Sequence, residues 1–405
     1  MEVRPGYKQT EVGVIPQDWE VRQFSEHFRI YAGGDVPKHS VAQTQSAAHP
    51  YPIFANALQN KGLYGYTAER RSNADSLTIS ARGYLGHAEY RDQPFFPIVR
   101  LLVLEPTGEL DARYTTYAVN DRVRFSVEST GVPQLTAPQV GKYSVAAPPT
   151  LPEQRAIAAA LSDVDALLGG LDRLIAKKRD LKQAAMQQLL TGQTRLPGFS
   201  GKWEVKRLGD LFKFSGGYSA SRDQLSTEGH CYLHYGDIHG SSKTTIDTTA
   251  DHQDIPKLDI SLKRVSPDSL LADGDVVFVD ASEDDDGTSK HVVVVNKAGL
   301  PFISGLHTIV AKPRTGELAH EYLRFCFHTA AIRQQFMFYA VGTKVSGISK
   351  TNIVKLTLPV PSVPEQTAIA TALSDMDAVL SALVARRDKT RDLKQAMMQE
   401  LLTGR

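Results

Sequence analysis

Two stretches of the chain carry a helical pattern of apolar positions, between residues 151–193 and 363–405. In the first stretch the apolar positions alternate four and three residues apart: Ile157, Leu161, Val164, Leu168, Leu171 and Ile175. In the second stretch the same spacing recurs before it breaks at Arg387: Ile369, Leu373, Met376, Leu380 and Leu383. This spacing places one apolar stripe on a single helix face. We therefore predict two long helices whose stripes serve packing.

The two helical stretches are copies of one another. They align without a gap at an offset of 212 residues, with about 27 identities in 43 positions. Each begins with an S/T-x-x-E capping box, Thr150 to Glu153 and Ser362 to Glu365, and each ends at a glycine. A helix of about 40 residues is roughly 60 Å long. Matching stripes and an intervening domain favour an antiparallel coiled coil between the copies.

The segments before the helices repeat more weakly. Trp19-Glu20-Val21-Arg22 is echoed by Trp203-Glu204-Val205-Lys206, and each precedes a glycine pair, 33–34 and 216–217. We expect the two tryptophans to be core anchors rather than base-stacking platforms. Short β-branched and aromatic runs predict strands at 77–79, 98–104, 276–279 and 291–295, and residues 322–339 are predicted to be helical. Each divergent segment is therefore predicted to be a mixed α+β domain.

Composition narrows the class of protein. The net charge of +1 gives no basic surplus of the kind that marks a strong stand-alone nucleic-acid binder. We find no apolar run of about 20 residues and no signal peptide, which predicts a cytoplasmic protein without a membrane partner. The two cysteines, Cys231 and Cys326, are expected to be buried free thiols.

Catalytic motifs are absent from the sequence. It contains no Asn-Pro-Pro or Asp-Pro-Pro methyltransferase motif, no G-x-x-x-x-G-K-[ST] loop, no H-E-x-x-H and no C-x-x-C. The acidic run Glu283 to Asp286 is expected to be a solvated loop rather than a metal site, and the histidines show no ligand spacing. We nominate no catalytic residue and no metal site. A nuclease or methyltransferase with its own specificity domains, and a coiled-coil scaffold that binds only proteins, remain the alternatives.

The chain resembles type I restriction-modification specificity subunits over nearly its whole length. The motifs that carry the resemblance are PEQ at 152–154 and 364–366, DLKQ-x-x-MQ-x-LLTG at 180–192 and 392–404, GYKQTEVGVIPQDWEV at 6–21, ARG at 81–83, FISGLHT at 302–308 and GTKVSGI at 342–348. The resemblance implies two target-recognition domains that each recognise one half of a bipartite double-stranded DNA site. It also implies that the helices hold these domains apart and bind two methyltransferase subunits, and that restriction subunits join the assembly.

The implied fold is α+β, with an internal pseudo-two-fold repeat: a first target-recognition domain at 1–149, a first spacer helix at 150–193, a second recognition domain at 194–361 and a second spacer helix at 362–405. The partner subunits would direct adenine methylation and restriction. S-adenosylmethionine, ATP and magnesium are expected in those partners, and this chain is expected to hold no cofactor. It would be a DNA-specificity subunit and not an enzyme.

Polar residues in predicted loops of the two domains are our candidates for DNA contacts. Arginine, lysine and small polar side chains contact base edges, and backbone N–H groups of glycine-containing loops contact phosphate. The candidates in the first domain are Lys38, Arg70, Arg71, Arg82, Gly83, Tyr84 and His87. Those in the second are Tyr218, Ser219, Ser221, Arg222, Ser242, Lys243, Ser289, Lys290, Lys344 and Lys350.

Overall fold

The computed structural model describes residues 4–37, 39–126, 133–241, 243–282, 290–342 and 346–404. The chain divides into two units. Unit 1 takes the described part of 1–173 together with 384–404, and unit 2 takes the described part of 174–383. Both long helices therefore contribute one half to each unit. The predicted domain boundaries at 149, 193 and 361 describe a different division and stay a prediction.

Unit 1 holds the first mixed domain. Its strands are β1 (Tyr7–Thr10), β2 (Gly13–Pro16), β3 (Glu20–Gln23), β4 (Phe28–Ala32), β5 (Tyr51–Phe54), β6 (Leu63–Thr67), β7 (Ser76–Ser80), β8 (Ala88–Arg91), β9 (Phe96–Pro97), β10 (Leu101–Pro106) and β11 (Ser144–Ala147). Its short helices are α1 (Phe24–His27), η1 (Gln59–Gly62), α2 (Ala112–Arg122) and α3 (Ala137–Gly141). The long helix α4 (Leu151–Leu189) begins here.

Unit 2 holds the second mixed domain. Its strands are β12 (Glu204–Arg207), β13 (Phe212–Gly216), β14 (His230–Leu233), β15 (Thr245–Asp247), β16 (Lys257–Leu258), β17 (Val276–Val279), β18 (Ala281–Ser282), β19 (His291–Val295), β20 (Phe302–Ser304), β21 (Thr308–Pro313), β22 (Ser346–Gly347) and β23 (Thr357–Val360). Its short helices are α5 (Leu208–Leu211), η2 (Arg222–Gln224), α6 (Tyr235–His239), η3 (Leu262–Arg264), η4 (Pro267–Ser269), α7 (His320–Cys326), α8 (Ala330–Tyr339) and α9 (Lys350–Ile353). The long helix α10 (Val363–Leu401) begins here.

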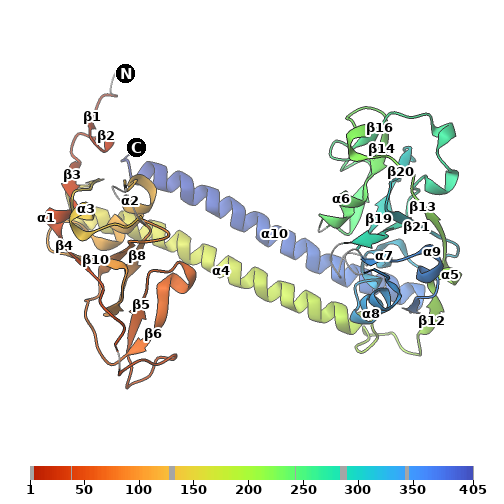
Figure 1. The fold of residues 1–405 in the computed structure, drawn as a ribbon, viewed down its shortest axis with the longest axis horizontal. Coiled ribbons are helices and arrows are strands. Elements are labelled where there is room, and N and C mark those ends of the chain that lie inside the picture. Colours follow the sequence, from red (N-terminus) through yellow and green to blue (C-terminus); the bar gives the residue numbers. More distant parts are fainter. Residues whose placement is uncertain are drawn as a thin grey trace. The chain divides into compact units, whose positions relative to one another are not determined.

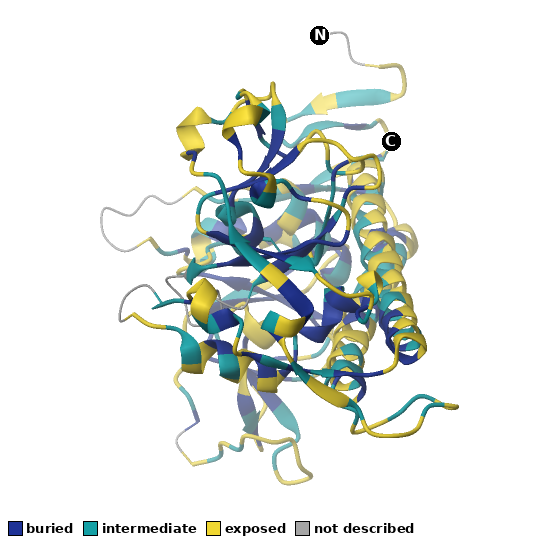
Figure 2. Ribbon diagram, turned by 90° about the vertical axis from the view of Figure 1, so that its right-hand side faces the viewer, coloured by how far each residue is buried: buried dark blue, intermediate teal, exposed yellow. Residues whose placement is uncertain are grey.

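Both domains contain β-sheets (Figure 1), and the sheets are related. The central sheet has the order β4-β10-β7-β8 in unit 1 and β13-β21-β17-β19-β15 in unit 2, which adds the strand β15. A second, three-stranded sheet lies beside each, β6-β5-β9 in unit 1 and β16-β14-β20 in unit 2. The central strands are apolar and buried, as in β17, which is buried at all four positions. Figure 2 shows that buried residues gather on interior strands and exposed residues on loops and on the long helices. The prediction of mixed α+β domains is confirmed.

The long helices pair in antiparallel fashion within each unit. In unit 1 Lys394 of α10 lies 2.7 Å from Asp165 of α4, and Arg387 lies 3.8 Å from Asp172. From the first ion pair to the second, the residue number increases by seven along α4 and decreases by seven along α10, as an antiparallel register requires. In unit 2 the ion pair of Lys182 with Asp377 continues this register. It is also the repeat equivalent of the Asp165–Lys394 pair, because both partners are displaced by 212.

The predicted stripes are buried or half-buried. In unit 1 Ile157 and Leu161 are in the core of the first domain, and in unit 2 Ile369 and Leu373 are in the core of the second. Leu171 and Ile175 are buried as well, at 5% and 2% exposed. The other stripe positions are half-buried: Val164, Leu168, Met376, Leu380 and Leu383. Residues 151–161 and 363–373 therefore anchor each helix to the domain that precedes it.

The glutamine of the first PEQ motif is a structural clamp. Gln154 is fully buried, and its Nε2 donates to the carbonyl oxygens of Glu109 and Pro148, both at 3.0 Å. Its Oε1 accepts from the backbone N–H of Asp111 at 2.8 Å. This amide therefore fixes the loop before α2 and the segment before α4 against one another.

The second PEQ motif repeats the clamp. The Nε2 atom of buried Gln366 donates to the carbonyl oxygens of Glu317 at 2.7 Å and Pro361 at 2.8 Å, and Oε1 accepts from Ala319 N–H at 2.8 Å. The repeated motif is thus explained by buried backbone groups that need partners.

The tryptophans anchor the helix ends. Trp19 is 3% exposed in the core of unit 1, and a Cβ on Gly404 would lie 3.2 Å from its ring. In unit 2 a Cβ on Gly192 would lie 3.5 Å from the ring of Trp203. Trp19 is a core residue, as expected, whereas Trp203 is half-buried and packs against the core of unit 2. Each helix ends on the tryptophan of the other repeat, which is the arrangement of a swapped pair.

The basic residue of the echoed motif has a partner in both units. Arg22 is 4% exposed and lies 3.4 Å from the carboxylate of Glu109, while Lys206 pairs with Glu317. These are the residues whose carbonyl oxygens the PEQ glutamines hold. The echo Trp-Glu-Val-Arg/Lys therefore belongs to the same junction as the PEQ motif.

Three expectations need correction. Residues 322–339 form two helices, since Phe327 ends α7 and the Thr329 hydroxyl caps α8 by accepting from Ile332 N–H. The strand predicted at 98–104 begins only at residue 101. The Thr150 hydroxyl accepts from the backbone N–H of Glu153 at 3.4 Å, but the carboxylate of Glu365 instead accepts from Arg195 and Trp203, because a guanidinium is a stronger partner than a backbone N–H.

Helix α10 also departs from the expectation about membranes. By length and composition alone, one stretch of it is apolar enough to cross a bilayer. Only 17% of that stretch is buried in the structure. The carboxylate of Asp377 in α10 forms an ion pair with Lys182 of α4.

Candidate nucleic-acid interface

In unit 1, three loops and one bridging residue are tied together beside the central sheet. The side chain of Asn56 holds the β7–β8 loop: Oδ1 accepts from Ala81 N–H at 2.8 Å and Nδ2 donates to the Arg82 carbonyl oxygen. Ala81 N–H also donates to the Arg100 carbonyl oxygen at 3.1 Å, and Leu135 N–H donates to the Ala81 carbonyl oxygen at 2.9 Å. We call Asn56, residues 81–86, residues 98–100 and Gln134 loop cluster 1.

Unit 2 contains the same backbone frame. Asp280 N–H donates to the His307 carbonyl oxygen at 3.1 Å, and Ile348 N–H donates to the Asp280 carbonyl oxygen at 2.8 Å. Gly305 N–H donates to the Leu233 carbonyl oxygen at 2.9 Å. The unit 1 counterpart of this last bond is Ile98 N–H to the Phe54 carbonyl oxygen, also 2.9 Å. We call Tyr235, Asp280, Lys290, residues 305–307 and residues 347–348 loop cluster 2.

Several side chains of loop cluster 1 are polar and accessible, whereas Ala81 and Ile98 are buried. Tyr84 is 70% exposed at the tip of the β7–β8 loop. Gly83 before it has φ +75° with nothing within 4 Å of a Cβ, so the loop needs glycine for its backbone conformation and not for space. Arg82 is half-buried, and Arg100 is exposed with its Nη1 donating to Gln134 Oε1 at 3.2 Å.

Loop cluster 2 carries different chemistry on the same frame. The Nδ1 atom of His307 lies 3.2 Å from Asp280 Oδ1, and the ring of Tyr235 meets the His307 ring edge-on at 5.4 Å. Nearby, His234 caps α6 by accepting Gly236 N–H at its Nδ1. Burial, and then the neighbouring Arg222 guanidinium, lower the pKa of His234, which favours the neutral ring.

The structure brings several predicted residues of the first domain to loop cluster 1 and separates others. Arg82, Gly83 and Tyr84 belong to it, and Arg71 lies alongside, since a Cβ on Gly34 would collide with its guanidinium. Arg70 is exposed nearby in sequence. His87 turns to Glu89, with Nε2 at 3.1 Å from Oε1, and lines a different cavity. Lys38 lies outside the described residues.

Most predicted residues of the second domain have structural partners. Arg222 pairs with Asp237 at 2.8 Å, Ser221 caps η2, and Lys290 Nζ donates to the His239 carbonyl oxygen at 2.6 Å. These contacts occupy the side chains and hold both Arg222 and Lys290 against α6. Lys290 belongs to loop cluster 2, and Arg222 lies outside it. Ser242, Ser289, Lys344 and the acidic run 283–286 lie outside the described residues.

The remaining predicted residues flank the glycine pair. Tyr218 N–H donates to the Ser304 carbonyl oxygen at 2.7 Å, and Ser219 is exposed beside it. Lys350 Nζ would lie 3.5 Å from a Cβ on Gly216. Position 217 requires glycine because the backbone of Gly305 approaches it closely. A Cβ on Gly217 would lie 1.8 Å from the carbonyl oxygen of Gly305.

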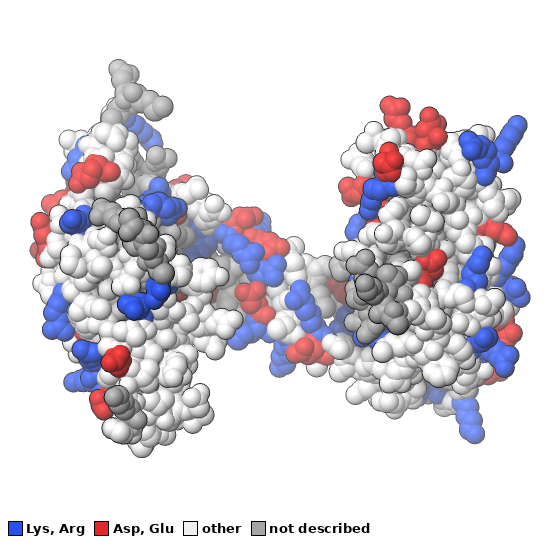
Figure 3. Space-filling model, viewed as in Figure 1, with Lys and Arg blue, Asp and Glu red and all other residues white. Residues whose placement is uncertain are grey.

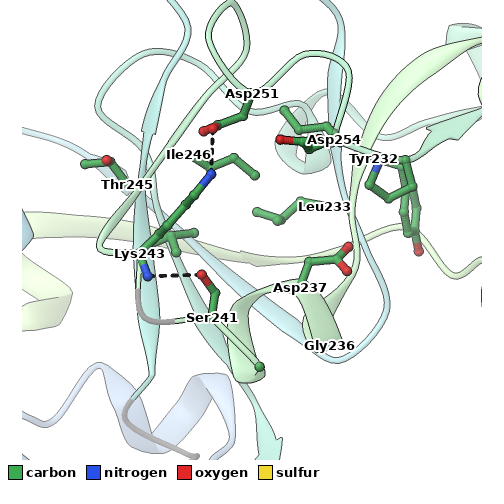
Figure 4. A pocket seen from close by; sticks show the side chains of 14 residues that line it. Tyr232, Leu233, Gly236, Asp237, Ser241, Lys243, Thr245, Ile246, Asp251 and Asp254 are labelled. Carbon is green, nitrogen blue, oxygen red and sulfur yellow. Dashed lines mark hydrogen bonds and ion pairs between the residues drawn. The ribbon is translucent and has the colours of Figure 1, made fainter. Parts of the chain in front are cut away.

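Lys243 is exposed, and its side chain lines an acidic cavity (Figure 4). Its Nζ lies 2.6 Å from Asp251 Oδ1, in a cavity of about 390 Å³ that is also lined by Asp237 and Asp254. Three carboxylates and one lysine give this cavity a negative balance, which repels phosphate. This cavity is therefore a poor candidate for a DNA-facing surface.

Charge on the surface is mixed. On the face seen in Figure 3, lysine and arginine are interspersed with aspartate and glutamate on both units.

Among the described residues, no group of three or more His, Cys, Asp or Glu side chains could hold a metal ion. Both cysteines are buried and free, as expected, and burial raises the pKa of the Cys326 thiol.

Six polar residues of the clusters are not among the predicted contacts: Asn56, Arg100, Gln134, Tyr235, Asp280 and His307. Of these, only His307 lies in one of the family motifs. Arg100 was placed inside the predicted strand 98–104, although a charged residue in an apolar run is a signal for a strand boundary. Asn56, Gln134, Tyr235 and Asp280 belong to no motif, and only the backbone frame brings them together.

Comparison with known proteins identifies the family. A family model described as type I restriction modification DNA specificity domain matches the chain twice, at residues 16–176 and 200–390. A putative type I specificity subunit of Mycoplasma pneumoniae is 30% identical over 159 residues, which cover 39% of this chain and 43% of that protein. The match thus spans less than half the length of that relative. A type I restriction enzyme specificity subunit of Methanocaldococcus jannaschii is 22% identical over 424 residues, 96% of this chain and 93% of that protein.

A solved structure agrees in fold. The type I restriction-modification S subunit from M. genitalium superposes with a TM-score of 0.61 at 15% identity, covering 99% of this chain and 98% of that chain. Two family domains with related sheets and the same loop frame account for the internal repeat. The chain therefore belongs to the type I restriction-modification DNA specificity family.

Proposed function

We propose that this chain recognises a bipartite double-stranded DNA site, with loop cluster 1 contacting one half-site and loop cluster 2 contacting the other. One observation carries the proposal: the two clusters share a backbone frame but present different side chains, Arg100 and Tyr84 against His307 and Tyr235. A shared frame suits the same task, and different side chains suit different base sequences.

The long helices are proposed to set the distance between the half-sites. Each is continuous over 39 residues, and each contributes one half to either unit. Ion pairs in a single antiparallel register support a stiff helix pair rather than two independent rods.

The same helices offer surfaces for partners. Leu167, Leu174 and Leu181 of α4 are 43%, 40% and 49% exposed, and their spacing of seven puts them on one face of the helix. Val379 and Leu393 of α10 are the repeat equivalents of Leu167 and Leu181 and are 46% and 56% exposed, whereas Arg386 takes the place of Leu174. Two related surfaces with exposed apolar side chains fit two copies of one partner, for which we propose the methyltransferase subunits.

The remaining roles belong to the partners. The methyltransferase subunits are proposed to bind S-adenosylmethionine and methylate adenine at sites that this chain selects. Restriction subunits, with ATP and magnesium, are proposed to complete the assembly. The chain would act in the cytoplasm, where its partners and DNA are found.

Modified-base mapping tests this proposal. DNA methylated by the chain with its methyltransferase subunits should carry methyladenine in a split sequence of two unlike halves. Replacing residues 20–145 with another such domain should change one half only, because the second cluster is untouched. A variant whose two half-sites both change, or a chain that methylates DNA without partners, contradicts the proposal. Proteins that assemble without sequence preference would identify a scaffold instead.

A further inference from the structure

Arg100 is an exposed residue of loop cluster 1, and the neutral side chain of Gln134 orients its guanidinium. Its Nη1 donates to Gln134 Oε1 at 3.2 Å, and among the described residues Gln134 is the one hydrogen-bond partner of the guanidinium. The remaining N–H groups of the fork therefore stay available to a ligand.

The backbone on both sides of this pair is fixed. The carbonyl oxygen of Arg100 accepts from Ala81 N–H, and Gln134 forms a bridge with Arg82. Asn56 holds the same loop from the other side, through its bonds to Ala81 and Arg82. The guanidinium is thus pre-organised at the surface, which reduces the cost of ordering it on binding.

Loop cluster 2 places a similar device at the equivalent position. His307 occupies the place of Arg100 in the frame, its side chain is 50% exposed, and its Nδ1 lies 3.2 Å from Asp280 Oδ1. In both units an exposed ring or guanidinium nitrogen is oriented by a side-chain oxygen. Neither pair belongs to a hydrophobic core, so packing does not explain why both exist.

We propose that Arg100 is a specificity-determining residue of the first module, that it contacts guanine in the major groove, and that Gln134 is its positioning residue. The inference rests on the proposed function. Arginine offers two parallel donors to guanine O6 and N7, which is the commonest specific arginine contact. A contact to phosphate is the competing role, and that role fits Arg71, whose guanidinium lies over Gly34.

Arg71 provides the matched control, because it is an exposed arginine at the same cluster. The full chain, assembled with its methyltransferase subunits, is used to select DNA from a library in which the first half-site is randomised. Wild type, Arg100→Ala, Gln134→Ala and Arg71→Ala are compared, and affinities are then measured at several salt concentrations.

Wild type should select guanine at one position of the first half-site. Arg100→Ala should lose about tenfold to a hundredfold in affinity for that sequence and should lose the guanine preference at that position alone. Gln134→Ala should weaken the guanine preference at the same DNA position, but by a smaller factor than Arg100→Ala. Arg71→Ala should weaken all sequences alike and reduce the salt dependence by about one phosphate contact.

Uniform weakening by Arg100→Ala, with every base preference intact, would overturn the inference and assign Arg100 to phosphate. So would relaxation at a position where wild type does not prefer guanine. If wild type selects no sequence at all, the proposed function fails, and this outcome is distinct from a failure at Arg100. Unchanged selection by both Gln134→Ala and Arg100→Ala would exclude the pair from recognition.

Discussion

Replacing Gln366 with leucine is expected to destabilise unit 2 far more than its single side chain suggests. The amide satisfies three backbone groups: the carbonyl oxygens of Glu317 and Pro361 and the N–H of Ala319. Leucine fills a similar volume but offers neither donor nor acceptor, so all three backbone groups lose their partner while the cavity stays filled.

The magnitude follows from those three groups. Each buried polar group left without a partner costs about 1–3 kcal/mol. Glu317 and Ala319 are half-buried and can regain some water, whereas Pro361 is buried. We therefore expect a loss of about 3–6 kcal/mol, a large part of the roughly 5–15 kcal/mol that stabilises a typical domain. Gln154→Leu should cost unit 1 a similar amount, since its clamp has the same three bonds.

The two tryptophans allow each unit to be followed separately by fluorescence during denaturant unfolding. A Trp19→Phe background leaves Trp203 as the reporter of unit 2, and the converse background reports on unit 1. Gln399→Ala, at an exposed position of α10, is the matched control and should change the free energy of unfolding by less than about 0.5 kcal/mol. A loss below about 1 kcal/mol for Gln366→Leu would refute the clamp.

Three further outcomes are expected. Arg195→Met should cost about 3–5 kcal/mol in thermal denaturation, because the carboxylate of Glu365 is 1% exposed and would lose its cation; a cost under about 1 kcal/mol would contradict this. Burial lowers the pKa of His234, so the unfolded chain binds the proton more strongly, and unit 2 should lose stability as pH falls below the ordinary value of 6.5 while staying unaffected above it. His234→Asn keeps a helix-capping acceptor and should flatten this dependence in a pH series of unfolding curves. Gly217→Ala should destabilise unit 2 by about 1–3 kcal/mol or more, whereas Gly216→Ala should be tolerated, and calorimetry showing equal effects would exclude the close backbone approach.

The helices were predictable because their signal is local and duplicated. The apolar spacing and the 212-residue repeat place them at 151–193 and 363–405, and the structure has them at Leu151–Leu189 and Val363–Leu401. The antiparallel pairing follows from the same repeat, because two matching stripes on one chain can bury each other. By contrast, the role of the PEQ glutamines depends on carbonyl oxygens about 45 residues away, which no local pattern reveals.

The loop clusters were only partly predictable. Arg82, Gly83 and Tyr84 stand out in sequence as a glycine-containing loop after a strand. Arg100 and His307 occupy equivalent positions because their carbonyl oxygens accept equivalent backbone hydrogen bonds. Such bonds do not depend on the side chain, so the sequence carries no signal for the equivalence. The equivalence between the two domains is therefore a property of the main chain, and it becomes visible only when the bonds of both units are compared.

The account depends on two unlike modules held a fixed distance apart on DNA, and the spacer between the half-sites measures that distance. Seven residues inserted after Lys177 in α4 and after Ser381 in α10 keep the stripes in phase and, by the register of the ion pairs, lie opposite one another. The helix pair would lengthen by about 10 Å, or roughly three base pairs at 3.4 Å each. Methyladenine mapping with this variant should return both original half-sites with a spacer about three base pairs longer. The same half-sites at an unchanged spacing would contradict the account.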